Sequence, residues 1–206
     1  MTAKIKLNAA SGGGSFSLQA PSSSANTRVM TLPDTADGTI LTTTNPKAGN
    51  IIQVLQAVKT DTFSLNGTAT SDVTGLSVAI TPSSTSNKIL VSYDLSMAVE
   101  YGGYNGFIFL LRGSTQIYLG DAAGSRTRAS SFMTSHSAGD FGAYEMFDVS
   151  GSFLDSPSTT SATTYKIQVR SHNSGRNVYL NRHQNDADGT GSPRTASSIT
   201  VMEVAG

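Results

Sequence analysis

The chain has 206 residues, a formal net charge of zero and no cysteine, and only 14% of its residues are charged. Typical soluble domains carry about 25% charged residues, so hydroxyls and amides must supply most of the solubility here. A neutral chain has no long-range field that attracts phosphates, which argues against nucleic-acid binding. The lack of cysteine excludes disulfides and thiolate metal sites.

The N-terminal residues show no targeting signal. Residues 1–7 lack the apolar core of a signal peptide. No apolar run approaches the roughly 20 residues that a membrane-spanning helix needs. We therefore expect a protein that folds in a cytoplasm, shows no sign of Sec export and does not insert into a membrane.

Residues 1–49 are predicted to form an extended N-terminal arm. Its apolar residues are thinly spread in short alternating pieces, which lie at 5–9, 16–20, 29–32 and 39–44. They cannot build a core alone, because ordering each residue costs about 1–2 kcal/mol of backbone entropy. Such an arm becomes stable when three copies intertwine, or when it adds strands to the sheet edge of a partner protein.

Residues 88–99 carry the clearest strand pattern. Apolar side chains occupy every second position, namely Ile89, Val91, Tyr93, Leu95, Met97 and Val99. Successive side chains of a strand point to opposite faces, so this pattern predicts a long strand with one buried face. The other face is small and nearly uncharged, since it carries Ser92, Asp94, Ser96 and Ala98 with Leu90. In an oligomer this second face would pack against a neighbour at little desolvation cost.

The rest of residues 50–206 follows the same scheme and is predicted to be one head domain. Further strands are expected at 50–58, 76–81, 106–112, 115–120, 144–154, 163–170, 177–182 and 197–204. Gly-, Pro-, Asn- and Ser-rich turn signals separate them. No window has a sustained helical period. The fold class is therefore predicted to be all-β, an antiparallel jelly-roll-like β-sandwich.

Three long loops are candidate binding regions, at 100–106, 121–143 and 181–194. Loops of this length in a compact domain usually bind a ligand or cover a partner. Side chains that suit receptor binding, because they stack on sugars or hydrogen-bond to them, are Tyr101, Tyr104, Asn105 and Asp121. Arg126 and Arg128 lie near Asp121 in sequence, which indicates either an anion pocket or ion pairs between subunits.

Catalytic and metal-binding signals are weak. His136, His172 and His183 are interpreted as polar surface or interface residues. Asp148 and Asp155 could pair with His172 in a triad, but no nucleophile motif supports one. Residues 185–189 resemble the start of a calcium loop but lack its later ligands, so an Asx-type turn is the preferred interpretation. We predict no catalytic residue, no cofactor and no metal.

Both ends of the chain resemble the structural proteins of tailed bacteriophage particles. The resemblance rests on IKLNAASGGGSFSLQAP at 5–21, MTLPDTADGTILTT at 30–43, VYLNR at 178–182 and ASSITVMEV at 196–204. It implies a virion component, usually a homotrimer with a jelly-roll-like head, made in the host cytoplasm. These motifs carry no active site.

Two roles follow from that resemblance. The first is a tail-fibre or spike module that attaches the virion to a host-surface glycan or protein, with the arm joined to other virion proteins. The alternative is a capsid decoration (cement) protein, with the arm lying on the shell. The arm motifs favour the fibre and the short length favours cement; we take host attachment as the leading hypothesis and an enzyme as a distant third.

Overall fold

The computed structural model describes residues 4–8, 11–19, 46–100, 104–135 and 140–206, together with 23, 25 and 102. The chain divides into two compact units, Met1–Ile40 and Leu41–Gly206, which are described separately. Several predictions lie outside the described residues, namely the strands at 29–32 and 39–44, Tyr101 and His136.

The first unit contains a β-hairpin of β1 (Lys4–Asn8) and β2 (Ser15–Gln19), which pair antiparallel. A positive φ at Gly12 helps to reverse the chain between them. Ile5 and Leu7 share one face of the hairpin and are 64% and 58% exposed. A hairpin of two strands is marginally stable in water at best.

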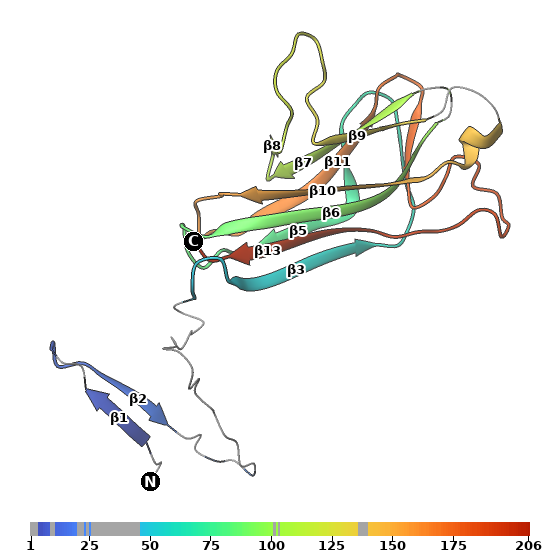
Figure 1. Cartoon of the computed structure of the whole chain (residues 1–206). Coiled ribbons are helices and arrows are strands. Elements are labelled where there is room, and N and C mark those ends of the chain that lie inside the picture. Colours follow the sequence, from blue (N-terminus) through green and yellow to red (C-terminus); the bar gives the residue numbers. More distant parts are fainter. Residues whose placement is uncertain are drawn as a thin grey trace, which may run out of the picture. The chain divides into compact units, whose positions relative to one another are not determined.

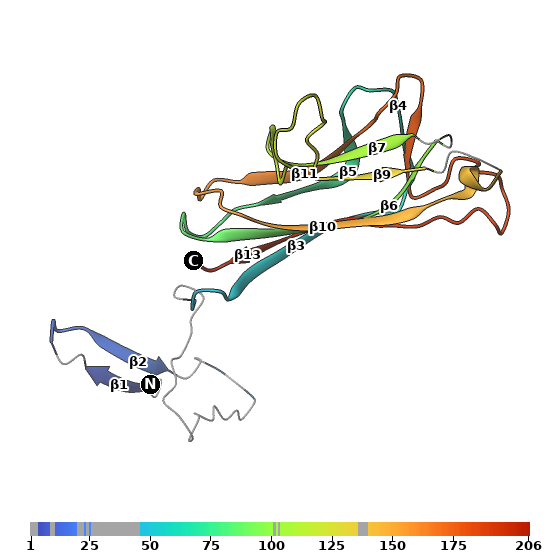
Figure 2. The same ribbon diagram turned by 45° about the horizontal axis from the view of Figure 1, so that its top comes forward.

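The second unit is a sandwich of two antiparallel sheets (Figures 1 and 2). The six-stranded sheet contains β3 (Ile51–Lys59), β4 (Phe63–Asn66), β6 (Lys88–Val99), β10 (Phe147–Asp155), β12 (Asn177–Leu180) and β13 (Ser197–Val204). The five-stranded sheet contains β5 (Ser71–Ile80), β7 (Asn105–Arg112), β8 (Thr115–Ile117), β9 (Ser131–Thr134) and β11 (Thr163–Ser171). The predicted all-β, antiparallel jelly-roll-like sandwich is thus confirmed.

Helical structure is minor in the described part of the chain. It consists of one 3₁₀ turn, η1 (Asp140–Tyr144), before β10. Within the described ranges no helix has the length and apolar character needed to cross a bilayer.

Strand β6 is the centre of the six-stranded sheet. It pairs with β10 along one side, and with β13 and then β12 along the other. Its predicted apolar face is buried throughout, from Ile89 to Val99, and packs against the inner faces of β5, β7 and β11. Each fully buried side chain of this size contributes about 1.5–3 kcal/mol of hydrophobic stabilisation.

The opposite face of β6 differs from the prediction in one half. Ser92 and Asp94 remain at the surface, whereas Ser96 and Ala98 are only 6% and 1% exposed. The sheet changes partner strand here, from β13 to β12, and the backbone N–H of Asn181 donates to the Ser96 carbonyl. Only the first half of this face is therefore free to meet a neighbour.

The strand limits show where sequence patterns were sufficient. Residues 88–99 and 197–204 are strands with the predicted bounds. The strand predicted at 115–120 ends at Ile117, because Tyr118 has a positive φ of 54° that breaks the extended conformation. Strands β4 and β9 were not predicted, since four residues are too few to show a reliable period.

Candidate binding surfaces

In the first predicted binding region, around Tyr104, side chains of the same chain bond to one another. The Arg176 guanidinium lies over the Tyr104 ring, 4.4 Å from its centroid, and its Nη1 donates to Glu100 Oε1 at 2.6 Å. Asn177 donates to Glu100 Oε2 from both its backbone N–H and its side-chain amide. Burial raises the pKa of Glu100, but these donors outweigh it and hold the pKa below its ordinary value. One face of the Tyr104 ring is thus occupied by an arginine.

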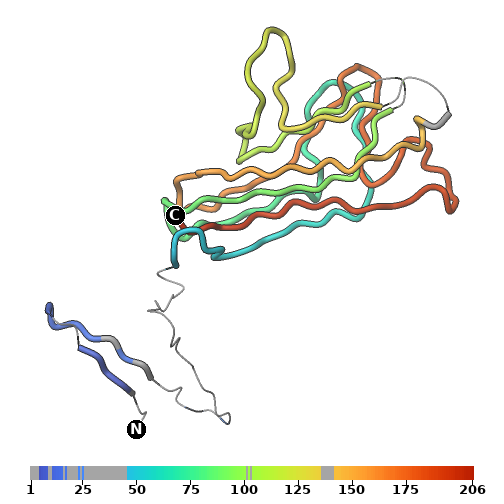
Figure 3. Tube along the Cα trace, in the orientation of Figure 1, coloured from blue at the N-terminus to red at the C-terminus, as the bar shows by residue number. Residues whose placement is uncertain are grey.

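A cavity of about 420 Å³ lies at the second predicted region, beneath the loop that links β8 to β9. We call it the loop pocket; its lining residues include Phe107, Asp121, Arg126, Thr127, Arg128 and Phe132. The loop projects from the five-stranded sheet in Figure 3. Phe107 on β7 and Phe132 on β9 are paired directly across the two strands, so they share one face of that sheet. Phe132 is 62% exposed.

Hydrogen bonds within the chain shape the loop around this pocket. Arg128 Nε donates to the Gly120 carbonyl at 2.7 Å, and Arg126 Nη1 donates to the Ala123 carbonyl at 3.3 Å. At the end of the loop, Ser130 accepts from the Leu110 backbone N–H at 2.8 Å. Both arginines therefore use one donor in these bonds within the loop, and each guanidinium carries further N–H donors.

The described residues do not balance the charges around the loop pocket. Four arginines elsewhere have a carboxylate within ion-pair distance, namely Arg112, Arg176, Arg182 and Arg194. Among the described residues, Arg126, Arg128 and Arg170 have no such carboxylate. Arg170 also belongs to this region, because it donates to Thr127 Oγ1 at 2.8 Å and lies over the Phe107 ring.

The predicted receptor-binding residues are only partly brought together. Asp121 lines the loop pocket with Arg126 and Arg128. Tyr104 and Asn105 lie at the start of β7, before Phe107, and do not line it. The contributions of Phe107 and Phe132 were missed. The pairing of β7 with β9 brings them together, and no local sequence signal marks that pairing.

The third predicted region, 181–194, is occupied by an arginine–aspartate cluster. The Asp186 carboxylate contacts Arg182 Nη1 at 2.7 Å and Arg194 Nη1 at 2.5 Å. These cations lower the pKa of Asp186, although burial acts in the opposite direction. The Asp186 carboxylate, which a calcium ion would need as a ligand, is thus ion-paired with two arginines. In the described ranges no group of acidic or histidine side chains has metal-binding geometry.

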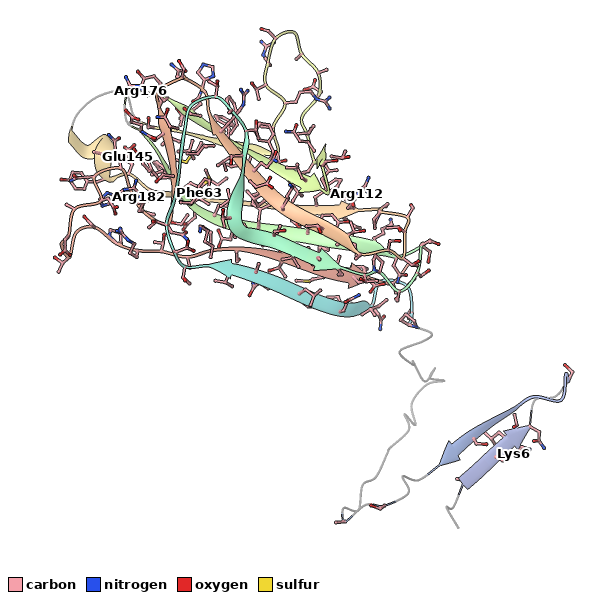
Figure 4. The ribbon with its side chains drawn as sticks, turned by 180° about the vertical axis from the view of Figure 1, so that it is seen from behind. Lys6, Phe63, Arg112, Glu145, Arg176 and Arg182 are labelled. Atoms are coloured by element: carbon pink, nitrogen blue, oxygen red, sulfur yellow. The ribbon has the colours of Figure 1, made fainter. Side chains whose placement is uncertain are left out.

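The histidines and the candidate triad carboxylate have structural surroundings. His183 is only 2% exposed and packs edge-on against Tyr144, so its predicted surface position is wrong. Burial arises because the loop folds back on it, with the Asp186 N–H donating to Nδ1. His172 is exposed and contacts Phe107. Asp155 binds Arg112 Nη1 at 2.9 Å and Tyr165 at 2.6 Å, which uses the carboxylate considered for His172. Figure 4 shows Arg112 at one end of the second unit and Arg176 at the other.

A second surface lies on the outer face of the six-stranded sheet. The strand register places four apolar side chains directly beside one another across four strands; this apolar row consists of Leu154, Leu90, Met202 and Val54. Leu154 and Val54, at its ends, are 46% and 53% exposed. Strands are spaced by about 4.8 Å, so the row extends about 14 Å across the sheet.

The rows that flank the apolar row consist of small, polar or apolar residues, with the exception of Lys88. On one side a hydroxyl and amide row contains Ser152, Ser92, Thr200 and Gln56. On the other side Val204 lies between Lys88 and the 56% exposed Ile51. Asp94 lies in the next row beyond the hydroxyl row. Lys88 lies in the row of Val204, directly beside the apolar row. Contiguous apolar surface of this kind on a soluble protein typically marks an interaction site.

No protein-family model matches the chain, and no characterised protein has a significantly similar sequence. The structure of infectious bursal disease virus, Gt strain, aligns with 94% of this chain and 48% of its own, at 10% identity and a TM-score of 0.38. The structure of T=1 particles derived from infectious bursal virus aligns with 92% of this chain and 49% of its own, at 11% identity and a TM-score of 0.37. The structure of the tripod from the baseplate of bacteriophage Tuc2009 aligns with 91% of this chain and 83% of its own, at 10% identity and a TM-score of 0.20. The chain spans about half the length of the two bursal-virus chains.

Proposed function

We propose that the chain is a non-enzymatic structural component of a bacteriophage virion, a homotrimeric tail-fibre or spike module that attaches the particle to its host. The loop pocket is the observation that carries this proposal. It combines an exposed aromatic side chain with two lining arginines, and a third arginine contacts its lining residue Thr127; none of the three has a carboxylate partner among the described residues. Such a site is suited to a ligand from outside the chain. The resemblance of the arm to phage fibre proteins agrees with it.

The apolar row supports assembly of the chain with copies of itself. The row crosses the strands, so three subunits whose strands follow a threefold axis would bring their rows into one closed apolar layer. Neighbouring layers would contain the hydroxyl row and Val204 with Ile51. Apart from Lys88, which is paired with Val204, the residues of these layers are uncharged, so a limited desolvation cost opposes the contact.

Removing the ends of the row tests the trimer. In the variant Val54→Ser/Leu154→Ser, both changed residues are about half exposed, so the subunit fold should persist. Each exchange should weaken the assembly by about 1–2 kcal/mol per subunit through lost apolar burial. Sedimentation velocity should show trimers for the wild type and monomers for the variant. Phe132→Ser, an equally exposed change on the other sheet, is the control. A wild-type monomer, or a variant that stays trimeric, would contradict the assignment.

We further propose that residues 1–49 are the attachment arm and residues 50–206 the head. The exposed apolar face of the β1–β2 hairpin supports this role, since it lacks a cover within the described part of its unit. Deleting residues 1–45 should leave a folded head that no longer joins particles. Incorporation of the truncated chain at the wild-type level would disprove the arm's role.

Capsid decoration is the alternative function, and the apolar row favours it equally. The number of copies per particle separates the two. Quantitative mass spectrometry of purified virions should find a few dozen copies or fewer for a fibre, whereas hundreds of copies would establish a decoration protein.

The receptor surface is proposed to include Tyr101, Tyr104, Asn105 and Asp121. Adsorption of particles that carry Tyr101→Ala/Tyr104→Ala tests the first loop, and Asp121→Asn tests the pocket. Reduced adsorption is expected for both. Unchanged adsorption of either variant removes that region from the receptor surface.

A further inference from the structure

We propose that the loop pocket binds the carboxylate of an acidic saccharide, such as a uronate or a sialate. This inference rests on the proposed function of host attachment and names the chemical class of the receptor. It follows from three properties of the pocket in the described structure: its arginines have no ion-paired carboxylate, Phe132 is exposed, and Asp121 is the carboxylate among its lining residues.

The arginines supply the carboxylate-binding part of the site. Arg126 and Arg128 line the pocket and are each held by a backbone carbonyl of the same loop. Their guanidinium groups are thus partly oriented before a ligand arrives, which reduces the entropy lost on binding. Arg170 adds a third positive charge next to Thr127. A guanidinium binds carboxylate oxygens through paired, charge-assisted hydrogen bonds, so a carboxylate is the natural ligand group.

The aromatic and polar residues select a sugar among carboxylates. Phe132 is exposed and lines the pocket together with Arg126 and Arg128, and the C–H face of a pyranose packs well on an aromatic side chain. Asp121 also lines the pocket, and its carboxylate can accept hydrogen bonds from sugar hydroxyls. The volume of about 420 Å³ is in the usual range of small-molecule sites and suits one or two sugar rings.

Asp121 also argues against polyanions. A phosphate chain or nucleic acid would place a second negative group near the Asp121 carboxylate, which has no cation within ion-pair distance among the described residues. A ligand with one carboxylate and several hydroxyls avoids that repulsion. The neutral charge of the whole chain likewise provides no field for a polyanion.

Titration calorimetry of the full chain with defined sugars tests the ligand class. The probes are methyl glucuronoside and methyl sialoside, with methyl glucoside as the neutral match and acetate as the bare carboxylate. We expect both acidic sugars to bind at least about tenfold more tightly than the glucoside or acetate, as loss of one charge-assisted contact predicts. Equal binding of the glucoside would overturn the role of the carboxylate. Equal binding of acetate would overturn the role of the sugar and indicate a partner's acidic side chain. No binding of either acidic sugar overturns the proposal.

Matched variants locate the site. Arg126→Gln/Arg128→Gln should weaken binding of the acidic sugars at least about tenfold, and Phe132→Ser should weaken it severalfold. Arg194→Gln removes an exposed arginine from another loop and should leave binding unchanged. Circular dichroism should show all three variants folded. Wild-type affinity in the double arginine variant would contradict the assignment.

Particle adsorption separates this inference from the proposed function. If Arg126→Gln/Arg128→Gln abolishes adsorption but the wild type binds no acidic sugar, host attachment stands and the ligand class is wrong. If the wild type binds acidic sugars through the pocket but the variant particles adsorb normally, the ligand class stands and attachment through this pocket is wrong.

Discussion

Replacing Glu203 by Gln should destabilise the protein strongly at neutral pH. Glu203 on β13 is fully buried, and within the described ranges no lysine or arginine lies within ion-pair distance. Neutral donors alone hold its charge: Gln53 at 2.6 Å, Asn87 at 2.5 Å, and Ser83 through its N–H at 2.6 Å and its hydroxyl at 2.7 Å. These contacts tie the end of β13 to β3 and to the turn before β6.

The size of the effect follows from the donor count. Every described group that bonds to the two carboxylate oxygens acts as a donor, so the amide NH₂ that the Glu203→Gln exchange introduces must point at one. Losing a hydrogen bond to a charged group costs about 1.5–3 kcal/mol, and the remaining contacts become weaker neutral ones. We expect a loss of about 2–4 kcal/mol. This loss is smaller than the free energy of unfolding of typical folded domains, which is about 5–15 kcal/mol. The variant should therefore still fold, with a reduced free energy of unfolding.

The effect should depend on pH with a defined sign. Burial raises the pKa of Glu203, but bonds from Gln53, Asn87 and Ser83 together hold it below the ordinary value of 4.5. A lowered folded-state pKa means that the charged form stabilises the fold above the ordinary value. This stabilisation is lost as the pH falls from there through the folded-state pKa. The difference between wild type and Glu203→Gln should therefore shrink on acidification.

Urea unfolding followed by circular dichroism, at neutral pH and in steps below pH 4.5, measures both quantities. Protein concentration is held constant because an oligomer's stability depends on it. Asp188→Asn, an exposed loop change, controls for the loss of one charge and should be nearly neutral. A Glu203→Gln protein as stable as wild type at neutral pH, or a difference that grows on acidification, would refute the reasoning.

Two further changes probe the sandwich core. Gly151→Ala should lower stability by about 1–3 kcal/mol, because the new Cβ would lie 2.8 Å from Cε1 of the buried Tyr93 ring. Thermal unfolding measures the effect, and Gly189→Ala, whose new Cβ would lie in open space, is the control. Equal melting temperatures for the two variants would contradict the clash. Tyr165→Phe should cost about 1.5–3 kcal/mol at neutral pH, because it removes the 2.6 Å hydrogen bond to the buried Asp155. A change below about 0.5 kcal/mol in urea unfolding would show that this bond contributes little.

Part of the site was visible in the sequence, and the reason is proximity along the chain. Arg126, Arg128 and Asp121 belong to one loop, so a shared pocket was among the predicted alternatives. Phe132 and Phe107 come from two different strands whose pairing places them side by side. A sequence pattern cannot show such a pairing, because it depends on the register of segments that are distant along the chain.

The contact of Arg176 with the Tyr104 ring could not be predicted from the sequence either. Its loop is aromatic and glycine-rich, which suits a free binding surface as well as a packed one. The structure places Arg176, from the turn before β12, over the ring and fixes that arginine with Glu100. Whether a side chain is free or already bonded is decided by its neighbours in space, and these come from another part of the chain.

The sequence by itself determined the all-β class and the buried face of β6, because alternation along a strand assigns each side chain to one of two faces without reference to any other segment. It did not determine what the opposite face does. The tertiary structure buries Ser96 and Ala98 within the chain and aligns Leu90 with Leu154, Met202 and Val54 into an exposed row. It also leaves three arginines without carboxylate partners in the described structure. Both outcomes depend on strand order and register, which long-range packing decides.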